Sequence, residues 1–176
     1  MPALGILSAV LLCLNVALVA QNRRLKASVE APPPAFIPEV GMKVSKLDGA
    51  AADGSRLTMA FGADSRKTLL LIFSTSCRVC DLNWPAWQSL VRSTLGRSYR
   101  LVYANIRSPL THGYVASHDI SGGTLFAEID PNTQTKLHIQ VTPLSVLFTS
   151  DGTVEAVWPG LLEGDDLTEI RNMLSR

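Results

Sequence analysis

The sequence has almost no net charge and few cysteines, and each shortage argues against a class of function. The 176 residues include 16 Lys and Arg against 15 Asp and Glu, which leaves a formal net charge of +1 at pH 7. A balance this close to zero gives no overall indication of binding to nucleic acid or to an anionic membrane surface. Three cysteines are too few for the disulfide framework of a small secreted scaffold. The length and the 47% hydrophobic content suit one globular domain with an appendage.

Two of the cysteines form a C-x-x-C pair, Cys77 and Cys80, whereas Cys13 stands alone in an apolar N-terminal run. The pair follows residues 68–73, a continuous apolar run typical of a strand that is buried on both faces. The pair also opens a helical pattern, so we expect Cys77 at the start of a helix. Unpaired backbone N–H groups and the helix dipole favour a negative charge there. A thiolate is such a charge, and the neighbouring Arg78 favours it further.

The C-x-x-C pair is compatible with disulfide exchange, metal binding or a static crosslink. A thiolate is the attacking species in disulfide exchange, and Cys80, one helical turn later, is close enough to resolve the mixed disulfide. A structural zinc site needs four ligands, and the histidines that could complete it lie far beyond the usual finger gap. A static crosslink that closes so short a loop removes little chain entropy. Disulfide exchange is therefore the preferred interpretation, with a non-catalytic copper or zinc carrier as an alternative. The histidines are His112, His118 and His138.

The first 22 residues have the composition of a membrane anchor. Residues 3–20 carry no charge, and as a helix they would be about 27 Å long, close to the hydrocarbon thickness of a bilayer. No Lys or Arg precedes this run, and Leu18 stands where cleavage of a signal peptide after Ala20 would need a small residue. We therefore expect residues 1–22 to form a single uncleaved transmembrane helix, with a cleaved signal peptide or a buried core helix as the alternatives.

Residues 23–38 combine a basic flank with a proline-rich linker, and we expect the folded domain over residues 39–176. Three consecutive prolines at 32–34 favour an extended polyproline II spacer. Taken alone, the basic flank favours a cytoplasmic location for the domain, because positively charged flanks of membrane helices tend to stay inside. The flank contains Arg23, Arg24 and Lys26.

The pattern of the domain predicts a mixed sheet with helices on both faces. A hairpin is expected within residues 44–61, and a second one around an Asp-Gly turn at 151–152. The helix that begins at the cysteines should present an apolar stripe, and the last helix should be capped by Asp165 or Asp166. The stripe comprises Leu82, Trp87, Leu90 and Val91. The other expected elements are strands at 68–73, 100–106 and 124–130, short helices at 109–118 and 130–139, and a final helix at 162–174.

Residues 68–90, TLLLIFSTSCRVCDLNWPAWQSL, resemble the active-site strand and helix of thioredoxin-fold proteins. They are most similar to the membrane-anchored TlpA/ResA-like thiol–disulfide oxidoreductases of bacteria, including the methylamine-utilisation accessory type. Pro85 stands where that family has a helix-kinking proline. The Thr142-Pro143 step, preceded by an Asp-Pro segment, is similar to the family's entry into its next strand. The resemblance extends over the whole of the expected domain.

This resemblance implies a thioredoxin-like α/β fold, with Pro143 in the cis form facing the cysteines and the backbone of Thr142 free to pair with a substrate. It implies catalysis by Cys77 and Cys80, with no cofactor other than their redox-active disulfide and no metal. The expected partners are protein thiols and disulfides of exported proteins and a membrane electron donor or acceptor, with no nucleic acid. The expected location is the bacterial inner membrane, with the domain outside the cytoplasm and a task such as cytochrome c biogenesis.

The sequence departs from the family pattern in three places. Ser76 replaces the tryptophan that usually precedes the first cysteine, and Arg78-Val79 fills the middle of the C-x-x-C pair, where the family often has a proline. Leu71 occupies the position of the buried acid of thioredoxin. Ser76 and Arg78 are therefore the candidates for tuning the acidity of the Cys77 thiol, and the positive charge of Arg78 predicts a more oxidising couple than thioredoxin.

A redoxin-type thiol peroxidase is the remaining alternative. Its chemistry needs a Pro-x-x-x-Thr-x-x-Cys arrangement around the peroxidatic cysteine. Here Leu70 and Ser74 occupy the proline and threonine positions, which argues against this function.

Overall fold

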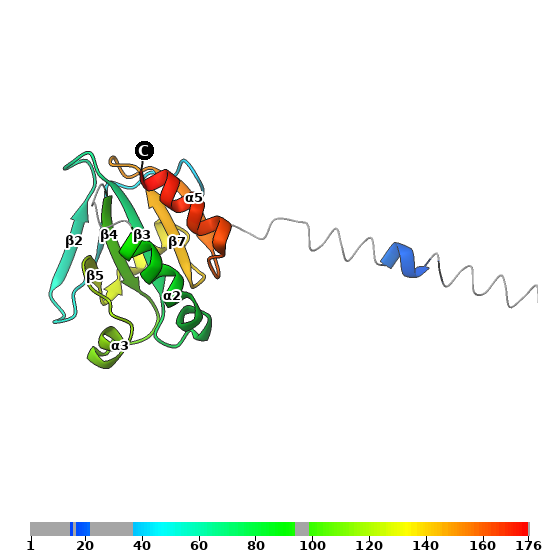
Figure 1. Ribbon diagram of the computed structural model, residues 1–176, viewed down its shortest axis with the longest axis horizontal. Coiled ribbons are helices and arrows are strands. Elements are labelled where there is room, and N and C mark those ends of the chain that lie inside the picture. The colour runs from blue at the N-terminus through cyan, green and yellow to red at the C-terminus, as the bar shows by residue number, and fades with distance from the viewer. Residues whose placement is uncertain (1–14, 16, 22–36, 94–98, 176) are drawn as a thin grey trace, which may run out of the picture. The chain divides into compact units, whose positions relative to one another are not determined.

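The computed structural model describes residues 15, 17–21, 37–93 and 99–175, and the chain divides into two units (Figure 1). The first unit, Met1–Ala35, is described only at residues 15 and 17–21, which are helical and exposed. The predicted anchor and linker, residues 1–38, therefore lie almost wholly outside the described residues. Within the residues that are described, no helix has both the length and the apolar content needed to cross a bilayer.

The second unit, Phe36–Arg176, contains two sheets and the helices that pack on them (Figure 1). The first half of the unit comprises β1 (Lys46–Ala50), β2 (Arg56–Ala60), β3 (Lys67–Phe73), α2 (Arg78–Ser93), β4 (Tyr99–Asn105) and α3 (His112–Ser117). The second half comprises β5 (Thr124–Phe126), β6 (Glu128–Ile129), α4 (Pro131–Lys136), β7 (Leu144–Phe148), β8 (Val154–Pro159) and α5 (Gly164–Leu174).

β3 lies at the centre of the larger sheet, whose strand order is β5-β4-β3-β7-β8. It pairs in parallel with β4 and antiparallel with β7, while β5 extends the parallel side and β8 the antiparallel side. Every β3 residue from Thr68 to Phe73 is buried, which confirms the central strand that the apolar run predicts. The sheet is mixed, as the order of the elements predicts.

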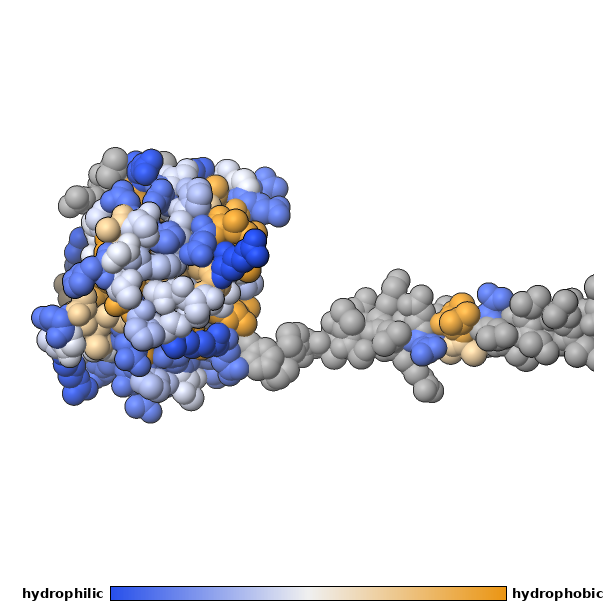
Figure 2. Space-filling model, turned by 90° about the horizontal axis from the view of Figure 1, so that it is seen from below, coloured by the Kyte–Doolittle hydropathy of each residue, from blue (hydrophilic) through white to orange (hydrophobic). Residues whose placement is uncertain are grey.

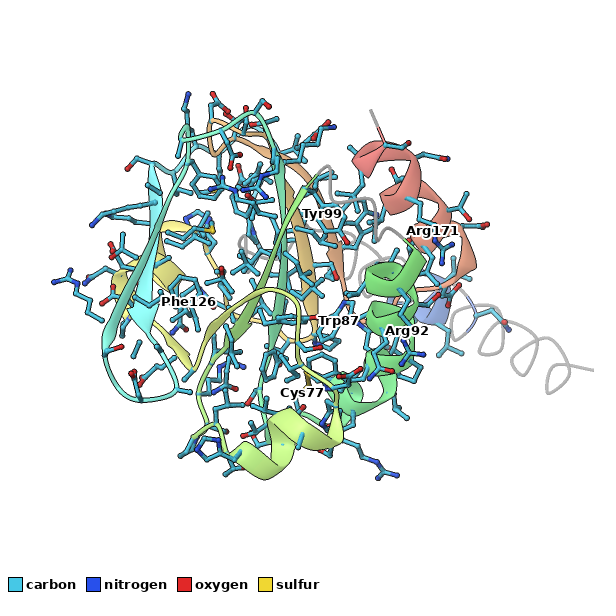
Figure 3. The ribbon with its side chains drawn as sticks, turned by 60° about the vertical axis from the view of Figure 1, so that its left-hand side comes forward. Cys77, Trp87, Arg92, Tyr99, Phe126 and Arg171 are labelled. Carbon is cyan, nitrogen blue, oxygen red and sulfur yellow. A yellow bond between two sulfur atoms is a disulfide. The ribbon has the colours of Figure 1, made fainter. Side chains whose placement is uncertain are left out.

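Successive side chains of β3 point to opposite faces of the sheet and fill two separate cores. Leu69 and Leu71 pack with residues of α2 and α5, whereas Leu70 packs with residues of the smaller sheet. Figure 3 shows Trp87 and Phe126, one from each core, on opposite sides of the larger sheet. The strand that leads to the cysteines is therefore anchored from both faces.

β1 and β2 form the N-terminal hairpin that the sequence predicts, and β6 pairs with the other edge of β1. The single strand expected at 124–130 is instead two strands in different sheets. The Ala127 N–H donates to the Ala50 carbonyl at 2.8 Å, so the chain passes from one sheet to the other at this residue. Phe126 and Ile129 on either side are both fully buried. An alternating pattern indicates a strand but not the sheet that it joins, so the sequence could not separate the two.

The buried face of α2 differs from the predicted stripe at one position. Leu82 is 65% exposed, whereas Trp84 is 3% exposed and joins Trp87 in the core. Trp87 Nε1 donates to Ser145 Oγ of β7 at 2.9 Å, so its polar atom is paired inside the core. The two large rings, three residues apart, thus set which face of the helix meets the sheet. Pro85 lies inside this helix, as the sequence predicts.

The cap of α5 also differs from expectation. The N-cap is Glu163 rather than Asp165 or Asp166. The Asp166 carboxylate instead accepts a hydrogen bond from the Glu163 N–H at 2.8 Å, which is the reciprocal half of a capping box. The helix itself lies within the predicted range.

We predict that the smaller sheet does not tolerate a methyl group at Gly49 of β1. A Cβ there would lie 2.7 Å from Phe126 Cδ1 and 3.1 Å from Ile129 Cα. Overpacking of this kind costs about 1–3 kcal/mol, so Gly49→Ala should lower the free energy of unfolding in urea by that amount. Gly113→Ala is the control, because nothing lies within 4 Å of a Cβ at that helical position. An unchanged unfolding free energy in Gly49→Ala would contradict the described packing.

Candidate active site

Cys77 and Cys80 form a disulfide at the point where β3 gives way to α2. Their Cα atoms are 5.2 Å apart. Cys77 is partly exposed, whereas Cys80 is fully buried. Figure 3 shows Cys77 at the end of the domain opposite to Tyr99, which is the carboxyl end of the parallel strands β3 and β4. Cys77 is therefore the sulfur that a partner reaches first, with Cys80 behind it.

The first turn of α2 directs backbone donors at Cys77. The Cys80 N–H lies 3.1 Å from Cys77 Sγ and also donates to the Cys77 carbonyl at 2.9 Å. The Asp81 N–H approaches the same carbonyl at 3.3 Å. When the disulfide is reduced, an N–H aimed at the sulfur favours a thiolate, as does the positive end of the helix dipole. The structure thus confirms the predicted location of Cys77 at a helix N-terminus.

The Thr142–Pro143 peptide bond is cis and lies beside the disulfide. The Thr142 carbonyl oxygen is 3.6 Å from Cys77 Sγ. A disulfide sulfur carries no proton, so this is a van der Waals contact that becomes a weak hydrogen bond only with a thiol. The Thr142 N–H has no hydrogen-bond partner among the described residues, and Pro143 has no N–H to offer. Both residues are next to Cys77 as expected, and substrate binding by Thr142 stays a prediction.

The two residues predicted to tune Cys77 take different positions. Ser76 Oγ lies 2.8 Å from Ser108 Oγ and 3.1 Å from Ser74 Oγ. Its hydroxyl therefore joins a serine cluster, and over the described ranges it makes no hydrogen bond to a sulfur. Arg78 is exposed, and its guanidinium has no ion-pair partner in the part of the chain that the structure describes. Arg78 can thus act on a thiolate only through its charge, whereas Ser76 ties down the loop before Cys77.

Leu71 occupies the position at which thioredoxin has a buried acid, and the side chains around Leu71 are apolar as well. Leu71 is fully buried in the same apolar cluster as Cys80, together with Phe73 and Trp84. Apolar burial disfavours a charged thiol. In the dithiol, the negative charge therefore belongs on Cys77 rather than on Cys80.

A hydrogen-bonded aromatic cluster beside the cysteines is the main feature that sequence reasoning missed. The Tyr114 hydroxyl donates to Asp81 Oδ1 at 3.2 Å and accepts from Trp84 Nε1 at 3.1 Å. His118 stacks on Tyr114 with ring centroids 4.2 Å apart, and its Nε2 is 3.4 Å from Asp81 Oδ1. Burial, together with the nearby Asp81, raises the pKa of Tyr114, so the phenol remains a neutral donor. In the sequence, the signal for this cluster was the i, i+4 spacing of Tyr114 and His118, which places the two rings on one face of a helix.

The histidines considered as metal ligands do not converge on the cysteines. His118 belongs to the aromatic cluster, His112 opens α3, and His138 follows the end of α4. Within residues 37–93 and 99–175, no group of three His, Cys, Asp or Glu side chains is arranged to hold a metal.

The surface at the α3 end of the domain is mostly hydrophilic, with separate apolar areas (Figure 2). Two exposed apolar side chains, Val79 and Leu82, lie one turn apart at the start of α2. Leu161 is a third, in the loop after β8. This loop contacts the same helix, because the Leu162 N–H donates to Asn83 Oδ1 at 2.9 Å. Val79 thus presents an exposed apolar side chain two residues after Cys77.

Solved structures share the fold of this domain. A thioredoxin-family thiol:disulfide interchange protein from Chlorobium tepidum aligns with a TM-score of 0.61 and 18% identity, over 77% of this chain and 97% of that one. A DsbF homologue from Corynebacterium diphtheriae aligns with a TM-score of 0.61 and 17% identity, over 75% and 86% of the two chains. A thiol:disulfide interchange protein from a Bacteroides species aligns with a TM-score of 0.59 and 12% identity, over 80% and 93%. No protein-family model and no curated protein matches the sequence.

At this level of identity the likeness establishes the fold. The domain has the thioredoxin-like α/β fold of the thiol:disulfide interchange proteins, extended by an N-terminal hairpin sheet. A C-x-x-C disulfide and a cis proline lie side by side within that fold. The fold and the disulfide that the sequence predicts are thereby confirmed.

Arg78 predicts a couple more oxidising than thioredoxin, whose midpoint potential is about −270 mV. A positive charge beside Cys77 stabilises the thiolate and hence the reduced form. Arg78→Gln should lower the midpoint potential by on the order of 10–20 mV, because an exposed charge contributes up to about 1 kcal/mol and 30 mV corresponds to about 1.4 kcal/mol. Equilibration with glutathione buffers measures both potentials, and Arg92→Gln in the last turn of α2 is the control. A wild-type potential below that of thioredoxin would refute the interpretation.

Proposed function

We propose that the chain is a membrane-tethered thiol–disulfide oxidoreductase that exchanges disulfides with the cysteines of other proteins. The observation that carries this proposal is the Cys77–Cys80 disulfide, in which Cys77 is partly exposed, Cys80 is buried, and Cys77 Sγ lies 3.6 Å from the Thr142 carbonyl oxygen. The arrangement offers a partner one accessible sulfur, a second sulfur behind it, and the Thr142 N–H, which has no hydrogen-bond partner among the residues that the structure describes. An extended substrate segment can pair with that N–H as it would with the edge of a sheet.

Reduction of a substrate disulfide takes two exchange steps. The Cys77 thiolate attacks one substrate sulfur, which forms a Cys77–substrate bond and releases the other substrate sulfur as a thiolate. Cys80, once deprotonated, attacks Cys77 Sγ, which restores the Cys77–Cys80 bond and releases the second substrate thiolate. Two electrons pass to the substrate, and its two thiolates take up the two protons that the dithiol lost. The reverse sequence introduces a disulfide into a dithiol substrate.

The two alternative functions have less support. At the motif positions of a thiol peroxidase, Leu70 is buried on β3 and the Ser74 hydroxyl is engaged with Ser76 and Ser108. Metal carriage needs further ligands next to the cysteines, whereas disulfide exchange needs only the two sulfurs. We therefore prefer disulfide exchange.

The proposal extends to location: the domain acts outside the cytoplasm, held at the bacterial inner membrane by residues 1–22. The support is the uncharged run at 3–20, the proline-rich linker that follows it, and the resemblance of residues 68–90 to oxidoreductases that work outside the cytoplasm. Partners in this setting are thiols of exported proteins, such as those of cytochrome c biogenesis. A membrane electron donor would reduce the Cys77–Cys80 pair again after it has reduced a substrate, and a membrane electron acceptor would reoxidise the pair after the reverse reaction.

Replacing the buried cysteine should trap substrates on the exposed one. In Cys80→Ser the mixed disulfide on Cys77 cannot be resolved, so covalent adducts should accumulate on non-reducing gels, where mass spectrometry identifies the partners. Cys77→Ser is the matched control, and it should trap far less because the sulfur that is left is buried. Equal adduct yields from the two variants would contradict the assignment of Cys77 as the attacking sulfur.

The location of the domain can be measured with reporters fused to the C-terminus. We expect a phosphatase that works only outside the cytoplasm to be active in the fusion. The basic flank opposes this orientation, so neutralising Arg23, Arg24 and Lys26 together should maintain or increase phosphatase activity. A fusion in which only a cytoplasmic reporter is active would overturn the proposed location.

A further inference from the structure

The turn that follows β4 has an unusual backbone at Arg107. Its φ is 68°, a left-handed value that is uncommon for a residue other than Gly, Asn or Asp. The Ser108 N–H donates to the Ile106 carbonyl at 2.9 Å, which closes a three-residue turn around Arg107 of the rare and strained γ type. Strain of this kind persists only where the surrounding contacts maintain it, and it clusters at functional sites. The contacts of this turn therefore indicate what it is for.

The residues on either side hold the turn against the larger sheet. The Ile106 N–H donates to the Phe73 carbonyl at 2.9 Å, at the end of β3. Asn105 is 1% exposed, and its Nδ2 donates to the carbonyls of Ser108 at 2.6 Å and of Ala127 at 2.9 Å. The backbone at the centre of the turn is thus fixed from both sides, and its side chain leaves the turn in a defined direction.

The turn contacts both halves of the cysteine site. On one side, Ser108 Oγ lies 2.8 Å from Ser76 Oγ, in the loop that carries the disulfide. On the other side, a terminal guanidinium nitrogen of Arg107 donates to the carbonyl of Gln140, two residues before Thr142. The turn therefore connects the loop that carries the disulfide, through Ser108, to the segment that leads into the cis proline, through Arg107.

We propose that Arg107 is a positioning residue that fixes the Thr142 N–H for pairing with a protein substrate, and so favours protein disulfides over small ones. The inference rests on the function proposed above. The Gln140 carbonyl accepts a hydrogen bond from the positively charged Arg107 guanidinium. A charge-assisted hydrogen bond of this kind is about twice as strong as a neutral one. A protein segment uses the Thr142 N–H, whereas a small disulfide needs only the Cys77 sulfur. Loss of the Arg107 side chain should therefore weaken binding of protein substrates and leave the sulfur chemistry unchanged.

Two substitutions at Arg107 distinguish the contribution of its side chain from that of its backbone conformation. Glycine adopts the positive φ without strain but cannot reach Gln140, so Arg107→Gly keeps the turn and removes the link. Lysine keeps the charge and a donor without the planar fork of arginine. Arg100→Gln is the matched control, because Arg100 also donates to a backbone carbonyl, that of Ala60 at 2.9 Å, near the start of β4 and away from the cysteines.

The test compares insulin, a protein disulfide substrate, with bis(2-hydroxyethyl) disulfide, a small one. In Arg107→Gly we expect the KM for insulin to rise about threefold, because the lost charge-assisted hydrogen bond is exposed to solvent, with kcat and turnover of the small disulfide unchanged. Arg107→Lys should fall between this variant and the wild type, and Arg100→Gln should match the wild type. A wild-type KM for insulin in Arg107→Gly, or an equal loss on both substrates, would overturn the proposal.

Hydrogen exchange of a peptide covering residues 138–143 tests the same link without any activity. Exchange in this peptide should be faster in Arg107→Gly than in the wild type and unchanged in Arg100→Gln, and an unchanged rate in Arg107→Gly would overturn the proposal. A failure of the proposed function would give a different result. The wild type would then reduce neither insulin nor the small disulfide, but exchange would still be faster in Arg107→Gly than in the wild type.

Discussion

The burial of β3 on both faces is the constraint on which the site depends. Leu70 and Leu71, adjacent in sequence, belong to different cores, so a shift of the strand by one residue would turn each of its side chains toward the wrong core. The strand therefore has one register against β4 and β7. Pairing with β4 ends at Phe73, which fixes where the chain leaves the sheet, and Cys77 follows four residues later. The location of the reactive sulfur is thus a consequence of how β3 packs in the two cores.

The topology of the larger sheet gathers the other parts of the site at the same edge. β3 and β4 are parallel, so the loops that follow them emerge together, and β7 is antiparallel to β3, so it starts there. The loop after β3 carries the disulfide, the turn after β4 carries Arg107, and the segment before β7 carries Thr142. Convergence at the carboxyl ends of parallel strands is the usual location of sites in open α/β sheets. Here it brings together the Cys77 sulfur, the Arg107 cation and the Thr142 N–H from three distant stretches of sequence.

Sequence reasoning found the parts of the site whose evidence is local. Cys77 and Cys80 are three residues apart, and the Thr142-Pro143 step forms a recognisable dipeptide. It missed Arg107, because the partner of that side chain is a carbonyl 33 residues further along the chain, which no spacing in the sequence reveals. The aromatic cluster was missed for the same reason, since it joins α2 to α3. Likewise, either Leu82 or Trp84 satisfies helical spacing, and only the packing of the large ring against the sheet decides between them.

The charges around the disulfide oppose one another, and their balance decides how easily the dithiol ionises. The Cys80 N–H, the helix dipole and Arg78 all favour a negative Cys77 sulfur. Asp81 opposes it, because a carboxylate four residues along a helix lies on nearly the same face. The Tyr114 hydroxyl donates to that carboxylate and His118 Nε2 lies 3.4 Å from it, so part of its charge is satisfied away from the sulfur. The aromatic cluster therefore also has an electrostatic role: it holds the Asp81 carboxylate in contacts that limit the effect of this charge on the thiolate.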